Sequence, residues 1–142
     1  MSRAYVSTAV RREIAERDRH RCAYCLSSEV LSGISLAIDH IVPVSAEGNS
    51  EPDNLCLACR SCNKFKGNQQ VALDPISGEL VSVFNPRQQL WSDHFRWQDE
   101  GVRVEGQTAV GRATVEALKL NNSLIVKSRA RWVQVGWHPP RD

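Results

Sequence analysis

The hydrophobic pattern of the first half of the chain predicts two helices separated by a strand. Val10 and Ile14 lie four positions apart, as on one face of a helix over residues 8–18. Residues 35–42 are mostly apolar or β-branched until a proline follows, which predicts a strand. Residues 60–66 are predicted to form a short helix that ends at a glycine.

The second half predicts a strand, a hairpin and two further helices. Residues 80–84 favour a strand, and residues 95–98 can pair with residues 102–105 as a hairpin. Thr108 can cap the helix that follows. The last helix ends before two prolines, and its apolar side chains share one face: Val126, Ala130, Val133 and Trp137. Helices mixed with short strands predict the α+β class.

Length and composition favour one small domain. A chain of 142 residues with 42% hydrophobic residues can bury a real but modest core. We therefore predict a single domain over residues 1–142, with a core motif at residues 20–68. A C-terminal extension, residues 74–138, is expected to pack around it. A core of this size would gain stability from a structural metal.

The overall charge does not indicate a binding partner. Lys and Arg number 18 and Asp and Glu 16, for a formal net charge of +2. Four cysteines that bound zinc as thiolates would bring this to about zero, so nucleic-acid binding has to rest on local basic patches and a bound cation. Residues 1–13 lack the apolar run of a signal peptide, and no segment is long enough to span a membrane. We expect a cytoplasmic protein without membrane contact.

Cysteine spacing indicates a metal site. Cys22 and Cys25 form one knuckle, with two residues between the thiols. Three more cysteines are evenly spaced further along: Cys56, Cys59 and Cys62. Spacing alone allows either neighbouring pair among them to be the second knuckle. Paired spacing of this kind favours zinc in a reduced compartment over disulfides, and four sulfur ligands leave no open position for catalysis.

The position of Asn63 favours one of the two pairs. If Cys59 and Cys62 are the second pair, Asn63 follows the last ligand directly and zinc is coupled to the predicted short helix. Cys56 is then expected to be a buried apolar residue. His20, two residues before the first knuckle, could replace a cysteine, but four well-placed cysteines favour a surface position for it.

Asp39 and His40 are candidates for hydrolytic chemistry. A carboxylate can bind a divalent cation, and a free imidazole titrates near neutrality, so it can take a proton from water. Neighbours on a regular strand face opposite sides, so a shared site needs a strand end, a twist or a bulge here. A second such pair, Asp93 and His94, has no flanking ligands and is expected to be structural.

The order of these residues resembles the HNH endonuclease family of the zinc-binding, ββα-metal type. The resemblance rests on Asp39-His40-Ile41-Val42-Pro43, then Asn54, then Cys59-x-x-Cys62-Asn63-x-x-Lys66, with Cys22 and Cys25 before them. The first of these motifs is also similar to the HNH domain of CRISPR effector nucleases. The resemblance covers about a third of the chain and is specific, because several typed positions match in order and spacing. It implies a ββα-metal core stabilised by a zinc site of four cysteines.

The resemblance also implies an activity, the metal-dependent hydrolysis of phosphodiester bonds in DNA. His40 would be the general base, and Asn54 would hold the loop and orient it. Asp39 and Asn63 would hold one catalytic Mg²⁺ or Mn²⁺. The last histidine of the family motif is Asn63 here, and its neutral oxygen donor favours these ions over softer metals.

Basic residues on the predicted short helix are candidates for phosphate contact. Arg60, Lys64 and Lys66 lie on the same helix as Asn63 and are expected to bind nucleic acid. The other arginines, Arg87 and Arg129 among them, are expected mostly on the solvated surface.

Two other functions fit the same residues. One is a zinc-stabilised DNA-binding module that does not cleave. The other is a nuclease subunit that is active only within a larger complex, such as a CRISPR or restriction assembly. An assay of the isolated chain with Mg²⁺ distinguishes these from an independent endonuclease.

Overall fold

The computed structural model describes residues 5–142, and its contacts divide them into two compact units. The first unit comprises the described residues up to Gln70 together with Asn85–Gln88. The second comprises Val71–Phe84 and Gln89–Asp142. The single domain expected from the sequence stays a prediction, because two compact units can belong to one domain or to two.

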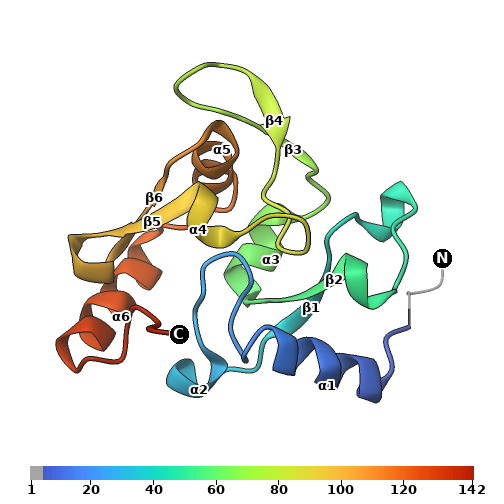
Figure 1. Ribbon diagram of the computed structural model, residues 1–142, viewed down its shortest axis with the longest axis horizontal. Helices are drawn as coiled ribbons and strands as arrows, with labels where there is room; N and C mark the ends of the chain where they lie inside the picture. The colour runs from blue at the N-terminus through green and yellow to red at the C-terminus, as the bar shows by residue number, and fades with distance from the viewer. Residues whose placement is uncertain (1–4) are drawn as a thin grey trace. The chain divides into compact units, whose positions relative to one another are not determined.

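The first unit is built from short elements (Figure 1). Its helices are α1 (Thr8–Arg17), α2 (Glu29–Ser32), α3 (Arg60–Lys66) and the 3-10 helices η1 (Val44–Ala46) and η2 (Pro52–Asn54). Its strands are β1 (Ala37–His40) and β2 (Leu55–Ala58), which pair into a two-stranded sheet. This mixture of helices and strands confirms the predicted α+β class.

Helix α1 forms where the sequence predicts it and packs on the sheet. The Ser7 side chain caps it by accepting a hydrogen bond of 3.1 Å from the Val10 backbone N–H. Ile14 is fully buried and packs with Leu55 and Leu57 of β2. This small apolar cluster holds the helix against the sheet.

Strands β1 and β2 run antiparallel in unbroken register. Asp39 lies opposite Cys56, and His40 lies opposite Leu55. Strand β1 ends at His40, so it is shorter than the predicted strand over residues 35–42. Successive side chains of a strand point to opposite faces, and the burial agrees: Asp39 is 5% exposed, whereas His40 is only half-buried.

Helix α3 follows β2 and contacts both strands (Figure 1). Cys59 is its N-cap, and the Cys59 sulfur accepts a hydrogen bond from the Cys62 backbone N–H. The helix ends at Gly67, whose φ of +51° is a conformation that glycine adopts most readily. The boundaries of the predicted short helix are confirmed, and β1, β2 and α3 follow one another in the predicted ββα order.

The second unit combines hairpins and helices. Strand β3 (Val71–Leu73) pairs with β4 (Leu80–Ser82), and β5 (Phe95–Gln98) pairs with β6 (Arg103–Gly106). Its helices are α4 (Trp91–His94), the 3-10 helix η3 (Asp99–Gly101), α5 (Ala109–Ala117) and α6 (Ser123–Gln134). The predicted hairpin and the Thr108 cap of α5 are confirmed, whereas β3 and α4 were not predicted. Each helix within residues 5–142 is too short or too polar to cross a bilayer.

Aromatic packing and one ion pair hold the second unit together. The buried rings of Phe84 and Phe95 meet edge to face, with centroids 5.2 Å apart. Asp74 is fully buried and accepts two hydrogen bonds, of 2.9 and 2.8 Å, from the Arg112 guanidinium. The guanidinium holds the pKa of Asp74 well below its ordinary value, so this carboxylate stays ionised.

An arginine of α6 is buried where the sequence predicts an apolar face. Arg129 is fully buried, 3.3 Å from the Val102 carbonyl oxygen and 5.4 Å from the centre of the Trp97 ring. Ala130 and Trp137, both assigned to that apolar face, are exposed. The prediction is therefore wrong for Ala130 and Trp137, whereas Val126 and Val133 are half-buried. The long Arg129 side chain packs in the interior, where the Trp97 ring and the Val102 carbonyl stabilise its charge.

Arg87 is mostly covered, with a side chain 13% exposed, and it ties residues 85–88 into the first unit. Its Nη2 lies 2.8 Å from both carboxylate oxygens of Asp18, and its Nε donates to the Leu55 carbonyl at 2.9 Å. The Asp18 carboxylate also accepts a hydrogen bond of 2.8 Å from the Leu57 backbone N–H. Arg87 therefore joins the end of α1 to β2. The sequence predicts a position on the solvated surface for Arg87, and the structure does not place it there.

We expect Arg87→Ala to lower the free energy of unfolding by about 3 kcal/mol, because it leaves a buried carboxylate without its charge partner. Urea denaturation of the full chain measures the loss. Arg12→Ala, at an exposed position of α1, is the matched control and should change it by less than about 0.5 kcal/mol. Equal effects of the two substitutions would show that the buried pair is not stabilising.

Candidate metal centre and active site

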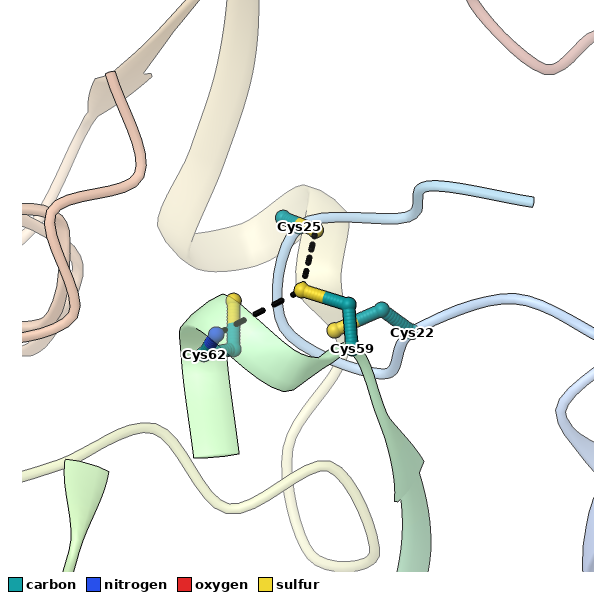
Figure 2. Close-up of side chains that lie close together, drawn as sticks. All are labelled: Cys22, Cys25, Cys59 and Cys62. Atoms are coloured by element: carbon teal, nitrogen blue, oxygen red, sulfur yellow. Dashed lines mark hydrogen bonds between the residues drawn. The ribbon is translucent and has the colours of Figure 1, made fainter. Parts of the chain in front are cut away.

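Four cysteine side chains converge in the first unit. The sulfur atoms of Cys22, Cys25, Cys59 and Cys62 all lie within 4.8 Å of one another. Figure 2 shows them turned toward a common centre from the first knuckle and from the start of α3. The sulfurs of Cys25 and Cys59 are 3.7 Å apart, which matches the edge of about 3.8 Å of a tetrahedron with zinc–sulfur bonds of about 2.3 Å. The four sulfurs could therefore hold one zinc ion.

Local backbone hydrogen bonds shape the first knuckle and dock it on the sheet. The Cys22 N–H donates to the Ser27 carbonyl, and the Leu26 N–H donates to the Cys22 carbonyl, both at 2.9 Å. The Ala23 N–H donates to the Leu57 carbonyl of β2, also at 2.9 Å. Because β2 leads directly into Cys59, this last bond brings the two knuckles together.

The remaining candidates for zinc ligands lie outside the cluster. Cys56 is fully buried on β2, with its sulfur 3.9 Å from an Asp39 carboxylate oxygen. His20 Nδ1 lies 2.6 Å from Glu29 Oε2, on a partly exposed surface. The geometry therefore places the second knuckle at Cys59 and Cys62, the pair that the position of Asn63 favours.

Three of the four cysteines of the cluster are buried, and Cys59 is partly buried. Burial raises the pKa of the Cys22 thiol well above its ordinary value, because a thiolate loses its hydration there. A divalent ion would compensate the charge of the deprotonated sulfurs. The donor set thus fits zinc.

The Asp39 carboxylate is buried and has several partners. The Tyr24 hydroxyl donates to Asp39 Oδ2 at 2.7 Å, and the Lys66 ammonium lies 3.2 Å from the same oxygen. Burial raises the pKa of Tyr24 well above its ordinary value, so its hydroxyl keeps the proton that it donates. The carboxylate therefore has a neutral donor and a cation beside it.

Lys66 differs from the sequence prediction. It is 2% exposed, and its ammonium also donates to the His40 carbonyl at 3.1 Å. It lies four positions after Cys62, so both side chains share the inner face of α3. This burial does not fit the prediction that Lys66 contacts nucleic acid, because its charge is directed at Asp39.

His40 and Asn54 lie on either side of one loop. His40 Nε2 is 3.0 Å from the Ser50 hydroxyl oxygen. The Asn54 side chain accepts from the Val42 N–H at 2.8 Å and donates to the carbonyls of Val42 and Asn49, at 3.0 and 2.8 Å. Asn54 thus closes the loop that carries Ser50 to the imidazole, and its role in orienting His40 stays a prediction.

The same loop has no room for a side chain at Gly48. A Cβ atom there would lie 1.7 Å from the Val42 carbonyl oxygen. The Gly48 N–H donates to the Pro43 carbonyl at 2.9 Å, so the chain folds back on the residues that follow β1. A larger residue would push the loop away from His40.

Asn63 lies in a groove of about 450 Å³ beside α3. The groove is lined by Ser35, Leu36, Ala37, Arg60, Asn63 and Lys64. Arg60 and Lys64 are exposed, so this face of α3 combines an amide with two cationic side chains, as the sequence predicts. In the described part of the chain, the Asn63 side chain makes no hydrogen bond to Asp39 or His40.

Two residues of the site were not singled out from the sequence. Tyr24 lies between the cysteines of the first knuckle, and a large aromatic in so short a turn could have indicated a buried role. Ser50 lies in a polar loop, and nothing in its spacing indicates contact with His40. Conversely, His94 contacts Thr108 at 2.6 Å in the second unit, in keeping with a structural role.

Comparison with known proteins bears on the same segment. Residues 22–69 match the family model of the HNH endonuclease. The match begins at the first knuckle and ends after α3, so it includes both knuckles and the ββα elements. Comparisons with curated proteins and with solved structures give no match. Residues 22–69, about a third of the chain, are thus similar to the HNH endonuclease family.

Proposed function

We propose that the chain is a metal-dependent endonuclease that hydrolyses phosphodiester bonds of DNA. The observation that carries the proposal is the HNH match over residues 22–69, a segment in which Asp39 and His40 end β1 and Asn63 lies on the adjoining α3. HNH nucleases act on nucleic acid through a metal and a histidine. A histidine, His40, and two candidate metal ligands, Asp39 and Asn63, are present here in the matching order.

Four cysteine thiolates would hold one structural zinc ion. Their sulfur atoms all lie within 4.8 Å of one another, and four sulfur ligands leave no position for water or substrate. The zinc would therefore fix the two knuckles, with β2 between them, and take no part in hydrolysis.

Asp39 and Asn63 would hold the catalytic cation. A carboxylate and an amide oxygen are hard donors, which suit Mg²⁺ or Mn²⁺. When bound, such an ion stabilises negative charge that develops on the phosphate and on the leaving oxygen. The exposed side chains of Arg60 and Lys64 would hold neighbouring phosphates of the strand.

His40 would act as the general base. When His40 Nε2–H donates a hydrogen bond to the Ser50 hydroxyl oxygen, Nδ1 carries the lone pair and takes a proton from the attacking water. Asn54 would keep the loop of Ser50 in place and so fix the orientation of the ring. The residues of this chain thus supply base, orientation and substrate binding.

Cys59→Ser is expected to reduce bound zinc from about one equivalent to about none and to lower the melting temperature, because a serine hydroxyl is a poor zinc ligand. Elemental analysis and thermal unfolding measure the two effects. Cys56→Ser is the matched control, since Cys56 is a buried cysteine of the same unit that is not part of the cluster. Retention of zinc by the Cys59 variant and its loss from the Cys56 variant would reverse the ligand assignment.

His40→Ala is expected to reduce plasmid nicking in Mg²⁺ at least about 100-fold while zinc content and melting temperature stay unchanged, because only the base is removed. His20→Ala, at a partly exposed histidine outside the site, should cleave like the wild type. EDTA should stop the wild-type reaction and excess Mg²⁺ should restore it. An active His40 variant would exclude this residue as the base, and an inactive wild type would favour a non-cleaving module or a subunit of a complex.

Lys64→Ala and Arg60→Ala are each expected to weaken DNA binding and to reduce the slope of log affinity against log salt concentration by about 1, because each removes one phosphate contact. Fluorescence anisotropy in the His40→Ala background measures binding without cleavage. Arg12→Ala on α1 should leave the slope unchanged. Equal slopes for all variants would place the DNA elsewhere.

A further inference from the structure

Tyr24 links the sulfur cluster to the Asp39 carboxylate. Its side chain is fully buried, and its hydroxyl is 2.7 Å from Asp39 Oδ2, across 15 positions of sequence. Tyr24 lies between Cys22 and Cys25, so its backbone belongs to the first knuckle. One residue therefore touches both parts of the site.

The backbone on either side of Tyr24 is held in place. The Ala23 N–H donates to the Leu57 carbonyl of β2, and Leu57 pairs with Ile38, the neighbour of Asp39 on β1. The position of the phenol relative to Asp39 is thus set through the sheet as well as through the sulfurs. A rigid donor of this kind can fix the rotation of a carboxylate, which a flexible side chain cannot.

The other contacts of Asp39 do not fix its orientation in this way. The Lys66 ammonium lies 3.2 Å from Oδ2 and 3.5 Å from Oδ1, so it attracts both oxygens. The Cys56 sulfur is 3.9 Å from Oδ2, and a thiol is a weak donor at that distance. Tyr24 makes the short, directional bond, which distinguishes Oδ2 from Oδ1.

We propose that Tyr24 is a positioning residue for Asp39, whose hydroxyl orients the carboxylate so that Oδ1 is presented to the catalytic cation. The inference rests on the proposed function of Asp39 as a ligand of that cation. It means that the knuckle that would bind zinc also sets the geometry of the hydrolytic site. Hydrogen-bond partners of ligating carboxylates typically contribute about 10-fold to 100-fold in metal affinity.

Tyr24→Phe tests the inference, since it removes the hydroxyl and keeps the ring. The zinc-loaded full chain is titrated with Mn²⁺ by calorimetry, for the wild type, Tyr24→Phe and Asp39→Asn. Tyr5→Phe is the matched control, because Tyr5 is the other tyrosine of the chain and is exposed. Zinc content and melting temperature are measured for each protein.

We expect Tyr24→Phe to raise the Kd for Mn²⁺ about tenfold with zinc content unchanged, Tyr5→Phe to bind like the wild type, and Asp39→Asn to lose the ion. In nicking assays the Mg²⁺ concentration for half-maximal rate should rise in the same ratio, while the rate at saturating Mg²⁺ changes less than about threefold.

Each other result decides against the inference. If Asp39→Asn loses Mn²⁺ but Tyr24→Phe binds it like the wild type, the proposed function stands and the positioning role falls. If Tyr24→Phe loses zinc, the hydroxyl is part of the fold and not a positioning group. If Asp39→Asn binds like the wild type, or the wild type binds no Mn²⁺, the assignment of Asp39 as ligand falls first and the role of Tyr24 with it.

Discussion

The first unit depends on the convergence of four sulfur atoms within 4.8 Å of one another. Its apolar core is small, with Ile14, Leu55 and Leu57 as the buried cluster, and such a core alone gives little stability. Closure at the sulfurs joins the turn after α1 to the start of α3 and so fixes the path of β2 between them. The placement of the site residues on β1 and α3 follows from that path, because both elements contact β2 or continue from it.

Asp39 and His40 illustrate how neighbouring residues on a strand acquire different surroundings. The regular pairing of β1 with β2 directs Asp39 inward, to Tyr24 and Lys66, and leaves His40 at the last position of the strand, against Ser50. A buried carboxylate close to a cation and a half-buried imidazole at a loop suit different tasks. We propose that the first binds a metal ion and that the second exchanges a proton with water.

Local signals in the sequence were sufficient for some features and not for others. The cap and the final glycine of the helix over residues 60–66 directly flank it in the sequence. The metal cluster and the family resemblance were predictable because both depend on the spacing of residues along the chain. Strand β2 was missed, since all of its residues are buried and it shows no alternation of apolar and polar positions. Lys66 and Arg129 are charged residues on helices, for which sequence favours a solvated position. Both are buried, as is Tyr24. Their burial could not be predicted, because their partners lie far away in sequence and no local pattern indicates them.

The chain path of the first unit limits how the segment that matches the family model can be separated from the rest of the chain. The family match stops at residue 69, yet residues 85–88 belong to the same compact unit, and Arg87 supplies the charge that faces Asp18. A fragment that began before Asp18 and ended at residue 69 would keep every cysteine and every motif residue, but it would leave Asp18 and the Leu55 carbonyl without this guanidinium. Transplanting the segment into another protein therefore requires either the residues up to Gln88 or a substitute cation for Arg87.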